Sequence, residues 1–147
     1  MTIRKATPDD IPRLMVMGEQ FAKYAPFDVE FSPEGAAAFV AGLMEIGLVL
    51  VAEQDGEILG GILGALTPMW YSPSNLMASE LAWWVAPEHR GGRAALQLLR
   101  AFEDWAKASG AKVITMSDLR IGEDYPAGPL FERMGYRVLE RAHIKEI

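Results

Sequence analysis

Cysteine is absent from this chain of 147 residues, and its absence removes several kinds of chemistry at once. Disulfides, thiolate metal sites and a cysteine nucleophile are all excluded. Histidine is also scarce, since only His89 and His143 occur and they stand far apart in the sequence. A zinc site needs three or four ligands drawn from cysteine, histidine and carboxylates. The sequence therefore makes no case for a metal.

Long apolar runs and basic clusters are missing as well. No stretch approaches the ~20 apolar residues that a membrane-spanning helix requires. The first residues, Met1 to Lys5, lead into a polar helix start, which is unlike a secretory signal. Nucleic-acid-binding domains usually show a basic face, and no basic run occurs here. We therefore expect a cytoplasmic protein with no membrane partner and no nucleic-acid partner.

The charge that is present is divided unevenly along the chain. Residues 1–80 hold 4 Lys/Arg and 11 Asp/Glu, whereas residues 81–147 hold 10 and 9. This asymmetry indicates an anion site in the second half and a first half that attracts cations. Ordinary solvated charge is the simpler explanation of the acidic half taken alone.

The apolar periodicity and the turn residues predict a single domain over residues 1–147. Half of the residues are hydrophobic, which is enough for one folded core. Expected strands cover 3–6, 48–52, 58–66, 81–85, 113–116 and 136–144. Expected helices begin at Thr7 and Ser32 and cover 92–109 and 130–134, and residues 67–79 are expected to form a loop. This order predicts an α/β fold, with a mixed sheet of about six strands and about four helices on both faces.

The stretch from Leu81 to Leu96 has the clearest functional pattern. A buried strand passes into a loop containing Gly91 and Gly92, and the loop opens into a long helix. The backbone N–H groups at a helix N-terminus favour anions, and a diphosphate is a natural ligand there. Arg90 and Arg93 would add cationic donors. A plain tight turn is also compatible with this pattern, which lacks the glycine motifs of nucleotide loops.

The residues around this loop resemble the GNAT superfamily of N-acetyltransferases. The family signature [Q/R]-x-x-G-x-[G/A] lies at the same junction of strand and helix. Arg90 matches its first position and Ala95 its last, while Arg93 stands in place of the central glycine. The start, Ile3 to Asp10, resembles the family's first strand and helix. Leu130 to Tyr136 resembles its L-Y-x-x-x-G-F signature.

This resemblance covers nearly the whole chain and implies both a fold and an activity. The implied fold is a GNAT-like, mostly antiparallel sheet. The implied activity is direct transfer of an acetyl group from acetyl-CoA to a primary amine of a small molecule or peptide, within a ternary complex. The implied co-substrate site consists of Arg90, Gly91, Gly92, Arg93, Ala94 and Ala95.

The resemblance also implies roles for the strand before the loop. In the family this strand presents backbone N–H groups to the thioester, and by position they belong to Trp84 and Val85. Glu80 lies five residues before Val85, where some members carry a glutamate that acts as the base. Burial beside Trp84 would raise the pKa of Glu80 and improve it as a base near neutral pH. A solvated glutamate at the strand end is equally compatible.

The remaining site residues leave alternatives open. The family often has a tyrosine where this chain has Phe131, and phenylalanine has no proton to donate. Tyr125 from the preceding loop, or solvent, could protonate the leaving thiolate instead. Trp70 and Tyr71, in the expected 67–79 loop, could stack on a cationic acceptor. They could equally pack beneath that loop as a small apolar cluster.

Two other functional classes also stay open at this point. A non-catalytic acyl-CoA-binding domain would account for Arg93 and Phe131, which depart from the family pattern. The second class is a toxin-like member of the family that acetylates aminoacyl-tRNA. The acidic first half of the chain argues against it, because contact with RNA favours a basic surface. The final segment is shorter than the two C-terminal strands of many relatives. One long strand, or a partner subunit in a possible homodimer, would then complete the sheet.

Overall fold

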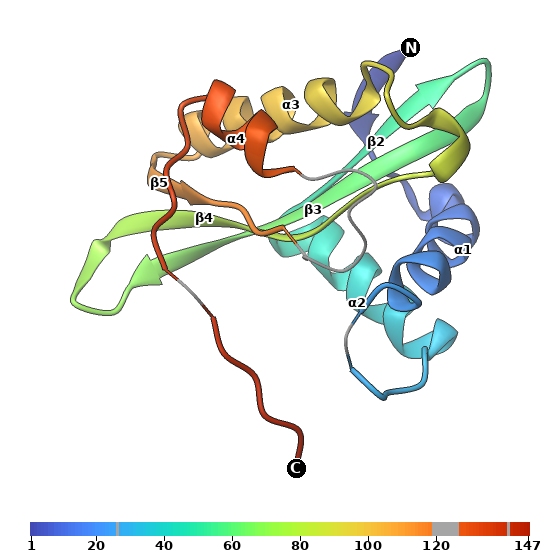
Figure 1. Cartoon of the computed structure of the whole chain (residues 1–147). Helices are drawn as coiled ribbons and strands as arrows, with labels where there is room; N and C mark the ends of the chain where they lie inside the picture. Colours follow the sequence, from blue (N-terminus) through green and yellow to red (C-terminus); the bar gives the residue numbers. More distant parts are fainter. Residues whose placement is uncertain (26, 119–126, 141) are drawn as a thin grey trace.

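The molecule is built around one sheet with helices on both of its faces (Figure 1). The computed structural model describes residues 1–25, 27–118, 127–140 and 142–147. The strands, which pair in the order of the chain, are β1 (Thr2–Lys5), β2 (Leu48–Gln54), β3 (Glu57–Met69), β4 (Ser72–Val85) and β5 (Ala111–Thr115). Neighbouring strands are antiparallel except β4 and β5, which are parallel.

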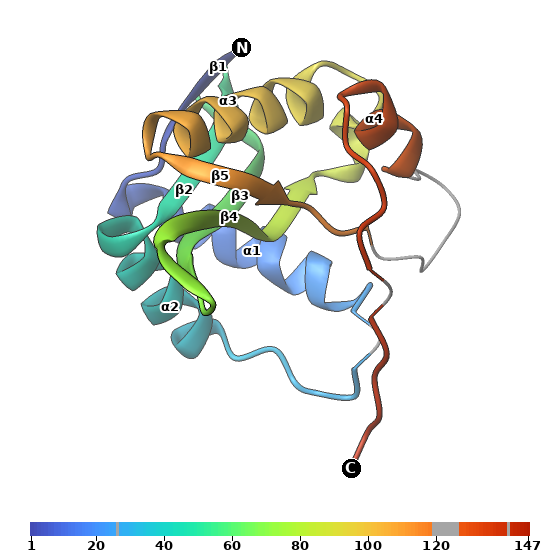
Figure 2. The same cartoon turned by 90° about the vertical axis from the view of Figure 1, so that its left-hand side faces the viewer.

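Two helices lie on each face of the sheet, as the two orthogonal views show (Figure 1, Figure 2). One face carries α1 (Ile11–Ala22) and α2 (Pro33–Ile46), and the other carries α3 (Ala94–Ala108) and α4 (Gly128–Arg133). The expected α/β class, with a mixed and mostly antiparallel sheet, is confirmed. Among the described helices, none has both the length and the apolar composition of a membrane-spanning segment.

Two expectations about the strands were wrong. Residues 67–79 are not a loop, because β3 and β4 continue as a hairpin in which Thr67 pairs with Met77 and Ala65 with Ser79. The prolines that suggested a loop lie near the tip of this hairpin, beside an irregularity in its register, where a missing N–H removes little pairing. Of the expected strand at 136–144, the described residues form none. The sheet therefore has five strands in the described part of the chain, close to the expected six.

The outer edge of β5 has no strand partner among the described residues. The chain beyond α4 leaves the body of the molecule, as Figure 1 shows, and it exposes Val138, Leu139 and Ile144. Open strand edges and exposed apolar side chains favour pairing with another chain. A homodimer that completes the sheet stays a prediction.

Two clusters of buried side chains join the helices to the sheet. The first lies between the sheet and α3 and includes Leu50, Ile62, Ala78, Leu98 and Phe102. The second lies between the sheet and the pair α1 and α2, and includes Leu14, Met17, Val40, Leu43 and Val51. Because β2 is buried on both faces, its sequence is a continuous apolar run without alternation.

Gly64 of β3 marks the closest approach of α3 to the sheet. A Cβ atom at this position would lie 2.4 Å from Cε2 of the buried Phe102. Gly64→Ala should therefore destabilise the fold by about 1–3 kcal/mol in urea unfolding, because overpacking forces neighbouring atoms apart. Gly42→Ala in α2 is the matched control, since its Cβ would meet nothing within 4 Å. It should be neutral or stabilise by up to about 1 kcal/mol. Equal losses at both sites would contradict this account of Gly64.

An ion pair connects the first strand to the start of α1. The Arg4 guanidinium donates to both carboxylate oxygens of Asp10, at 2.7 and 2.9 Å. The backbone N–H of Thr7 also donates to this carboxylate at 2.7 Å, which is one of the bonds of a capping box. These bonds, the Arg4 bond above all, stabilise the charged form and lower the pKa of Asp10 from 3.8 to about 2.

The lowered pKa of Asp10 predicts a pH dependence of stability. The folded pKa lies below the unfolded one, so the contribution is present above about pH 4 and is lost as the pH falls toward 2. Asp10→Asn should lower the free energy of unfolding at pH 7 by on the order of 1–2 kcal/mol. Urea unfolding of both proteins from pH 7 down to pH 2 measures the difference. A difference that does not shrink below pH 4 would assign the loss to something other than this charge.

Candidate active site

The sheet forks where β4 and β5 part. Their parallel pairing covers only Leu76–Ser79 of β4, after which β5 ends at Thr115 and β4 continues to Val85. Residues 80–85 therefore have β3 on one side and no strand on the other within the described chain. Backbone groups on this open side are available to a ligand.

Glu80 stands at the fork and connects its two branches. Its Oε2 accepts hydrogen bonds from the Ser117 hydroxyl at 3.1 Å and from the Ser117 backbone N–H at 3.3 Å. Burial raises the pKa of Glu80 above its usual value, while the two Ser117 bonds act in the opposite direction. A carboxylate with a raised pKa is better matched to proton abstraction near neutral pH.

A β-bulge determines the face on which Glu80 lies. Ala82 pairs with Leu63 and Glu80 with Gly64, so Leu81 is an extra residue without a partner. Glu80 therefore shares the face of Gly64, whose Cβ position meets Phe102 of α3. Trp84 pairs with Gly61 and packs with the α1 and α2 cluster on the other face. The expectation that Trp84 buries Glu80 was wrong, because one inserted residue reverses the alternation.

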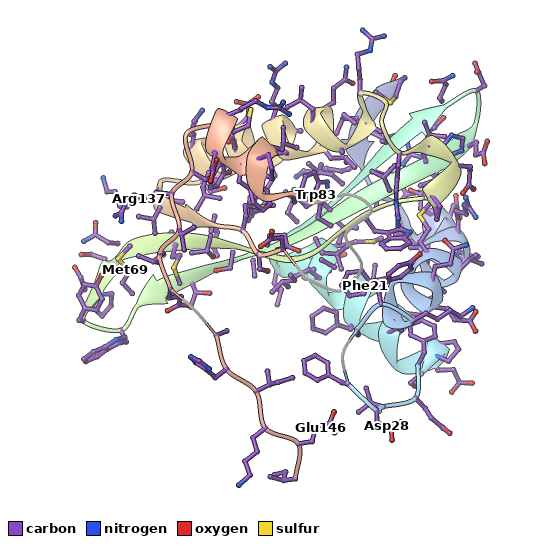
Figure 3. All side chains as sticks on the ribbon, in the orientation of Figure 1. Phe21, Asp28, Met69, Trp83, Arg137 and Glu146 are labelled. Carbon is purple, nitrogen blue, oxygen red and sulfur yellow. The ribbon has the colours of Figure 1, made fainter. Side chains whose placement is uncertain are left out.

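The two tryptophans of β4 lie on opposite faces of the sheet. Trp83 packs on the α3 side, with its ring 5.7 Å from that of Phe131 in α4. Trp84 packs on the α1 side, with its ring 6.0 Å from that of Phe21. Figure 3 labels Trp83 and Phe21 on the two sides of the sheet. Phe131, which replaces the tyrosine of the family signature, is thus a buried core residue.

The backbone of β4 directs one of the two expected donors to the fork. The N–H of Ala86 donates to the Leu59 carbonyl of β3 at 2.9 Å. Because bonding alternates along an antiparallel pair, the N–H of Trp84 also faces β3 and that of Val85 faces the fork. The Val85 carbonyl, on the same side, accepts from Nε of Arg90 at 2.9 Å. Val85 is therefore the better-placed donor of the two.

The loop after β4 has the geometry of an anion site. Gly91 adopts a φ of 78°, in the left-handed region that favours glycine. The helix α3 starts after Arg93 without any side-chain capping bond. Its first intrahelical bond runs from Gln97 N–H to the Arg93 carbonyl, so the N–H groups of Ala94 and Ala95 have no partner within the helix.

A cavity of about 250 Å³ lies beside this loop and has mixed polarity. Its lining comprises Met1, Gln54, Leu59, His89, Gly92, Arg93 and Ala94. Arg93 is exposed there, whereas Arg90 is held against the sheet. The Arg90 guanidinium lies 4.3 Å from the centre of the Trp84 ring and 5.7 Å from that of Tyr24. Arg90 therefore positions the loop, and Arg93 is the better candidate for direct contact with an anion.

The structure does not bring the remaining predicted residues to the fork. Trp70 and Tyr71 form the tip of the β3–β4 hairpin, with 89% and 71% of their surface exposed. Eight residues of extended β4 separate this tip from Glu80, which corresponds to roughly 25–30 Å. The hypothesis that they stack on an acceptor bound at the fork of their own chain therefore finds no support, and neither side chain is packed beneath a loop. Tyr125 lies outside the described residues.

A second cavity, which sequence reasoning missed, lies on the opposite face of the sheet. It has a volume of about 310 Å³, is partly open to solvent, and is lined by residues of α1, α2, the connection between them, β3 and β4. Each of its residues looks like an ordinary core position in the sequence, so only their arrangement in space reveals the cavity.

Ser117 was missed for a similar reason, because only the fold places it against Glu80. Among the described residues, no group of three His, Asp or Glu is arranged for a metal.

Comparison with known proteins agrees with this geometry. The model of the acetyltransferase (GNAT) family matches residues 19–136. The uncharacterized N-acetyltransferase YhfO of Bacillus subtilis (strain 168) is 28% identical, and the match covers 92% of this chain and 89% of that protein. 

Solved structures show the same fold over the whole chain. A ribosomal-protein-alanine N-acetyltransferase from Brucella melitensis biovar Abortus 2308 superposes with a TM-score of 0.77 at 16% identity, covering 100% of both chains. A predicted acetyltransferase from Clostridium acetobutylicum, solved with acetyl-CoA, has a TM-score of 0.77 at 15% identity, covering 99% of this chain and 95% of that one. With its fork, its glycine loop and a family match over most of its length, this chain belongs to the acetyltransferase (GNAT) family.

Proposed function

We propose that the protein transfers an acetyl group from acetyl-CoA to a primary amine, directly and within a ternary complex. The fork between β4 and β5 is the observation that supports this most strongly. A carboxylate with a raised pKa and an outward backbone N–H lie on the same short stretch of β4. The loop that follows this stretch leads straight into the uncapped N-terminus of α3.

The residues of the loop fit the diphosphate of acetyl-CoA. Ala94 and Ala95 offer backbone N–H groups that α3 itself does not use, and the helix macrodipole adds positive potential there. Gly91 and Gly92 expose backbone without a side chain in front of it, and Arg93 adds a cation. Bound acetyl-CoA would supply the acetyl group as a thioester.

The residues at the fork fit the proton and charge changes of acetyl transfer. A protonated amine first loses one proton to solvent, and Glu80 takes a second proton as the neutral nitrogen bonds to the acetyl carbon. The Val85 N–H donates to the carbonyl oxygen, on which negative charge develops. The carbon–sulfur bond breaks, and either Tyr125 or solvent protonates the leaving thiolate, because Phe131 has no proton to give. The chain has no cysteine to hold the acetyl group covalently, which supports direct transfer.

Arg93→Glu should weaken the binding of CoA about tenfold, because it replaces a cation at the N-terminus of α3 by an anion. Calorimetric titration with CoA measures the change. Arg100→Glu is the matched control, since Arg100 is also exposed on α3 but lies about two turns further along it. Similar losses in both variants would indicate a general charge effect and not a phosphate contact at Arg93.

A thiol-release assay with acetyl-CoA tests the proposed activity itself. The acceptor panel should contain polyamines, aminoglycosides, amino acids, peptides and hydrophobic amines. We expect amine-dependent release of CoA with at least one of these classes. Tight binding of acetyl-CoA without release for any amine would favour the alternative, a non-catalytic acyl-CoA-binding domain.

A further inference from the structure

The 310 Å³ cavity between α1, α2 and the sheet is lined entirely by apolar residues. Its helical walls include Leu14, Met17, Phe21 and Phe39, and its sheet wall includes Ala82 and Trp84. Among its lining residues, Nε1 of Trp84 is the one side-chain polar atom, and it is buried without a hydrogen-bond partner. The walls therefore match the hydrocarbon part of a ligand.

This apolar cavity adjoins the fork. Ala82 and Trp84, which form its sheet wall, belong to the stretch of β4 that β5 does not cover. The Trp84 ring lies 4.3 Å from the Arg90 guanidinium, 6.0 Å from the ring of Phe21 and 5.2 Å from that of Tyr24. A ligand seated in the cavity thus approaches the fork from the α1 and α2 face, and its amine reaches Glu80, on the α3 face, along the side of β4 that β5 leaves uncovered (Figure 1).

The chain beside the cavity is acidic. The connection between α1 and α2 contributes Phe31 to the lining, and Asp28, Glu30 and Glu34 on and after it are exposed. Figure 3 shows Asp28 on this connection, away from the sheet. Acidic groups next to an apolar cavity raise the local concentration of cations. Charge and apolar surface together match a protonated amine with a hydrocarbon body.

We propose that this apolar cavity binds the hydrocarbon part of the acceptor, so that the acceptors are hydrophobic primary amines. The inference rests on the proposed function and names its substrate class. A cavity of about 150 Å³ accepts a benzene molecule, so this one has room for one or two rings or for an alkyl chain of similar volume. In this proposal the apolar cavity, and not Trp70 or Tyr71, contacts the acceptor.

The first experiment is an acceptor series of unbranched primary amines from ethylamine to octylamine, with acetyl-CoA saturating. We expect kcat/KM to rise about fourfold with each added methylene until the cavity is full, and then to level off. The α,ω-diamines of the same chain lengths, which carry a second charged amine, should show no such rise in kcat/KM. Values that are flat from ethylamine onward would overturn the inference.

The second experiment measures binding without turnover. Calorimetry with 2-phenylethylamine, in the presence of CoA, compares Ala36→Phe with Ala38→Phe. Both positions lie in α2, but only Ala36 lines the cavity, whereas Ala38 is exposed. Ala36→Phe should weaken binding at least tenfold and Ala38→Phe should leave it unchanged, with the affinity for CoA preserved in both. Should Ala36→Phe not fold, Ala22→Leu fills the same cavity from α1.

The outcomes separate this inference from the proposed function. If no amine is acetylated but 2-phenylethylamine binds and Ala36→Phe abolishes its binding, the transfer activity fails and the amine site stands. If polar amines are acetylated while hydrophobic amines neither bind nor react, the activity stands and the inference is overturned. If nothing is acetylated and 2-phenylethylamine does not bind, both are overturned.

Discussion

Glu80→Gln should lower turnover about 10²–10⁴-fold at neutral pH, which is the usual cost of losing a general base. The amide keeps the size of the side chain but cannot accept the proton of the amine. Binding of acetyl-CoA should be unchanged, because its proposed contacts lie in the loop and in α3 and not at Glu80. Initial rates of thiol release and calorimetry with CoA measure the two quantities. Turnover equal to that of the unaltered protein would reduce Glu80 to a structural partner of Ser117.

Ser117→Ala provides a control that keeps the carboxylate. The Ser117 hydroxyl donates to Glu80 and so lowers its pKa, against the larger effect of burial. Removing the hydroxyl should raise the pKa of Glu80 further. Since the base must be deprotonated to act, the acidic limb of the pH–rate profile should then move to higher pH. A general loss of stability would lower the rate at every pH but would not shift this limb.

Phe102→Ala should lower the free energy of unfolding by about 3–5 kcal/mol, the largest effect on stability that we expect from one substitution. The Phe102 side chain is 0% exposed and lies in the cluster between α3 and the sheet. Its ring stacks on that of Trp105 at 5.6 Å and faces Gly64, so its removal leaves a cavity beneath the fork. Urea unfolding measures the loss.

Phe39→Ala is the matched control for this stability prediction. The side chain of Phe39 is 58% exposed on α2, so its removal should cost well under half as much as removal of Phe102. Comparable losses at the two sites would show that the cluster around Phe102 does not dominate the stability of the fold.

Local signals in the sequence determined most of the secondary structure. The Asp55-Gly56 pair is typical of a tight hairpin turn, and both residues adopt the positive φ values, 54° and 81°, that such a turn requires. Gly47 is the residue after the last turn of α2, and Gly110 follows soon after α3, where glycine is common. The two glycines before α3 and the arginines around them marked the loop correctly. Each of these features depends only on residues that are neighbours in the chain.

Which of the predicted site residues lie together depends on contacts between distant parts of the chain. The bulge at Leu81 turns Glu80 to the α3 face and Trp84 to the other, although alternation along a regular strand would place both on one face. The hairpin carries Trp70 and Tyr71 away from the fork. Arg90 folds back onto Trp84 and the Val85 carbonyl, which leaves Arg93 at the helix N-terminus.

The apolar cavity shows most directly what the sequence could not determine. Its walls come from four elements that are separated along the chain, and each wall residue follows the same apolar pattern as a filled core. Periodicity predicts which face of a helix or strand is buried, but not whether the faces that meet fill the space between them. That depends on the volumes of side chains brought together from distant parts of the chain, and so it is determined only when the helices pack on the sheet.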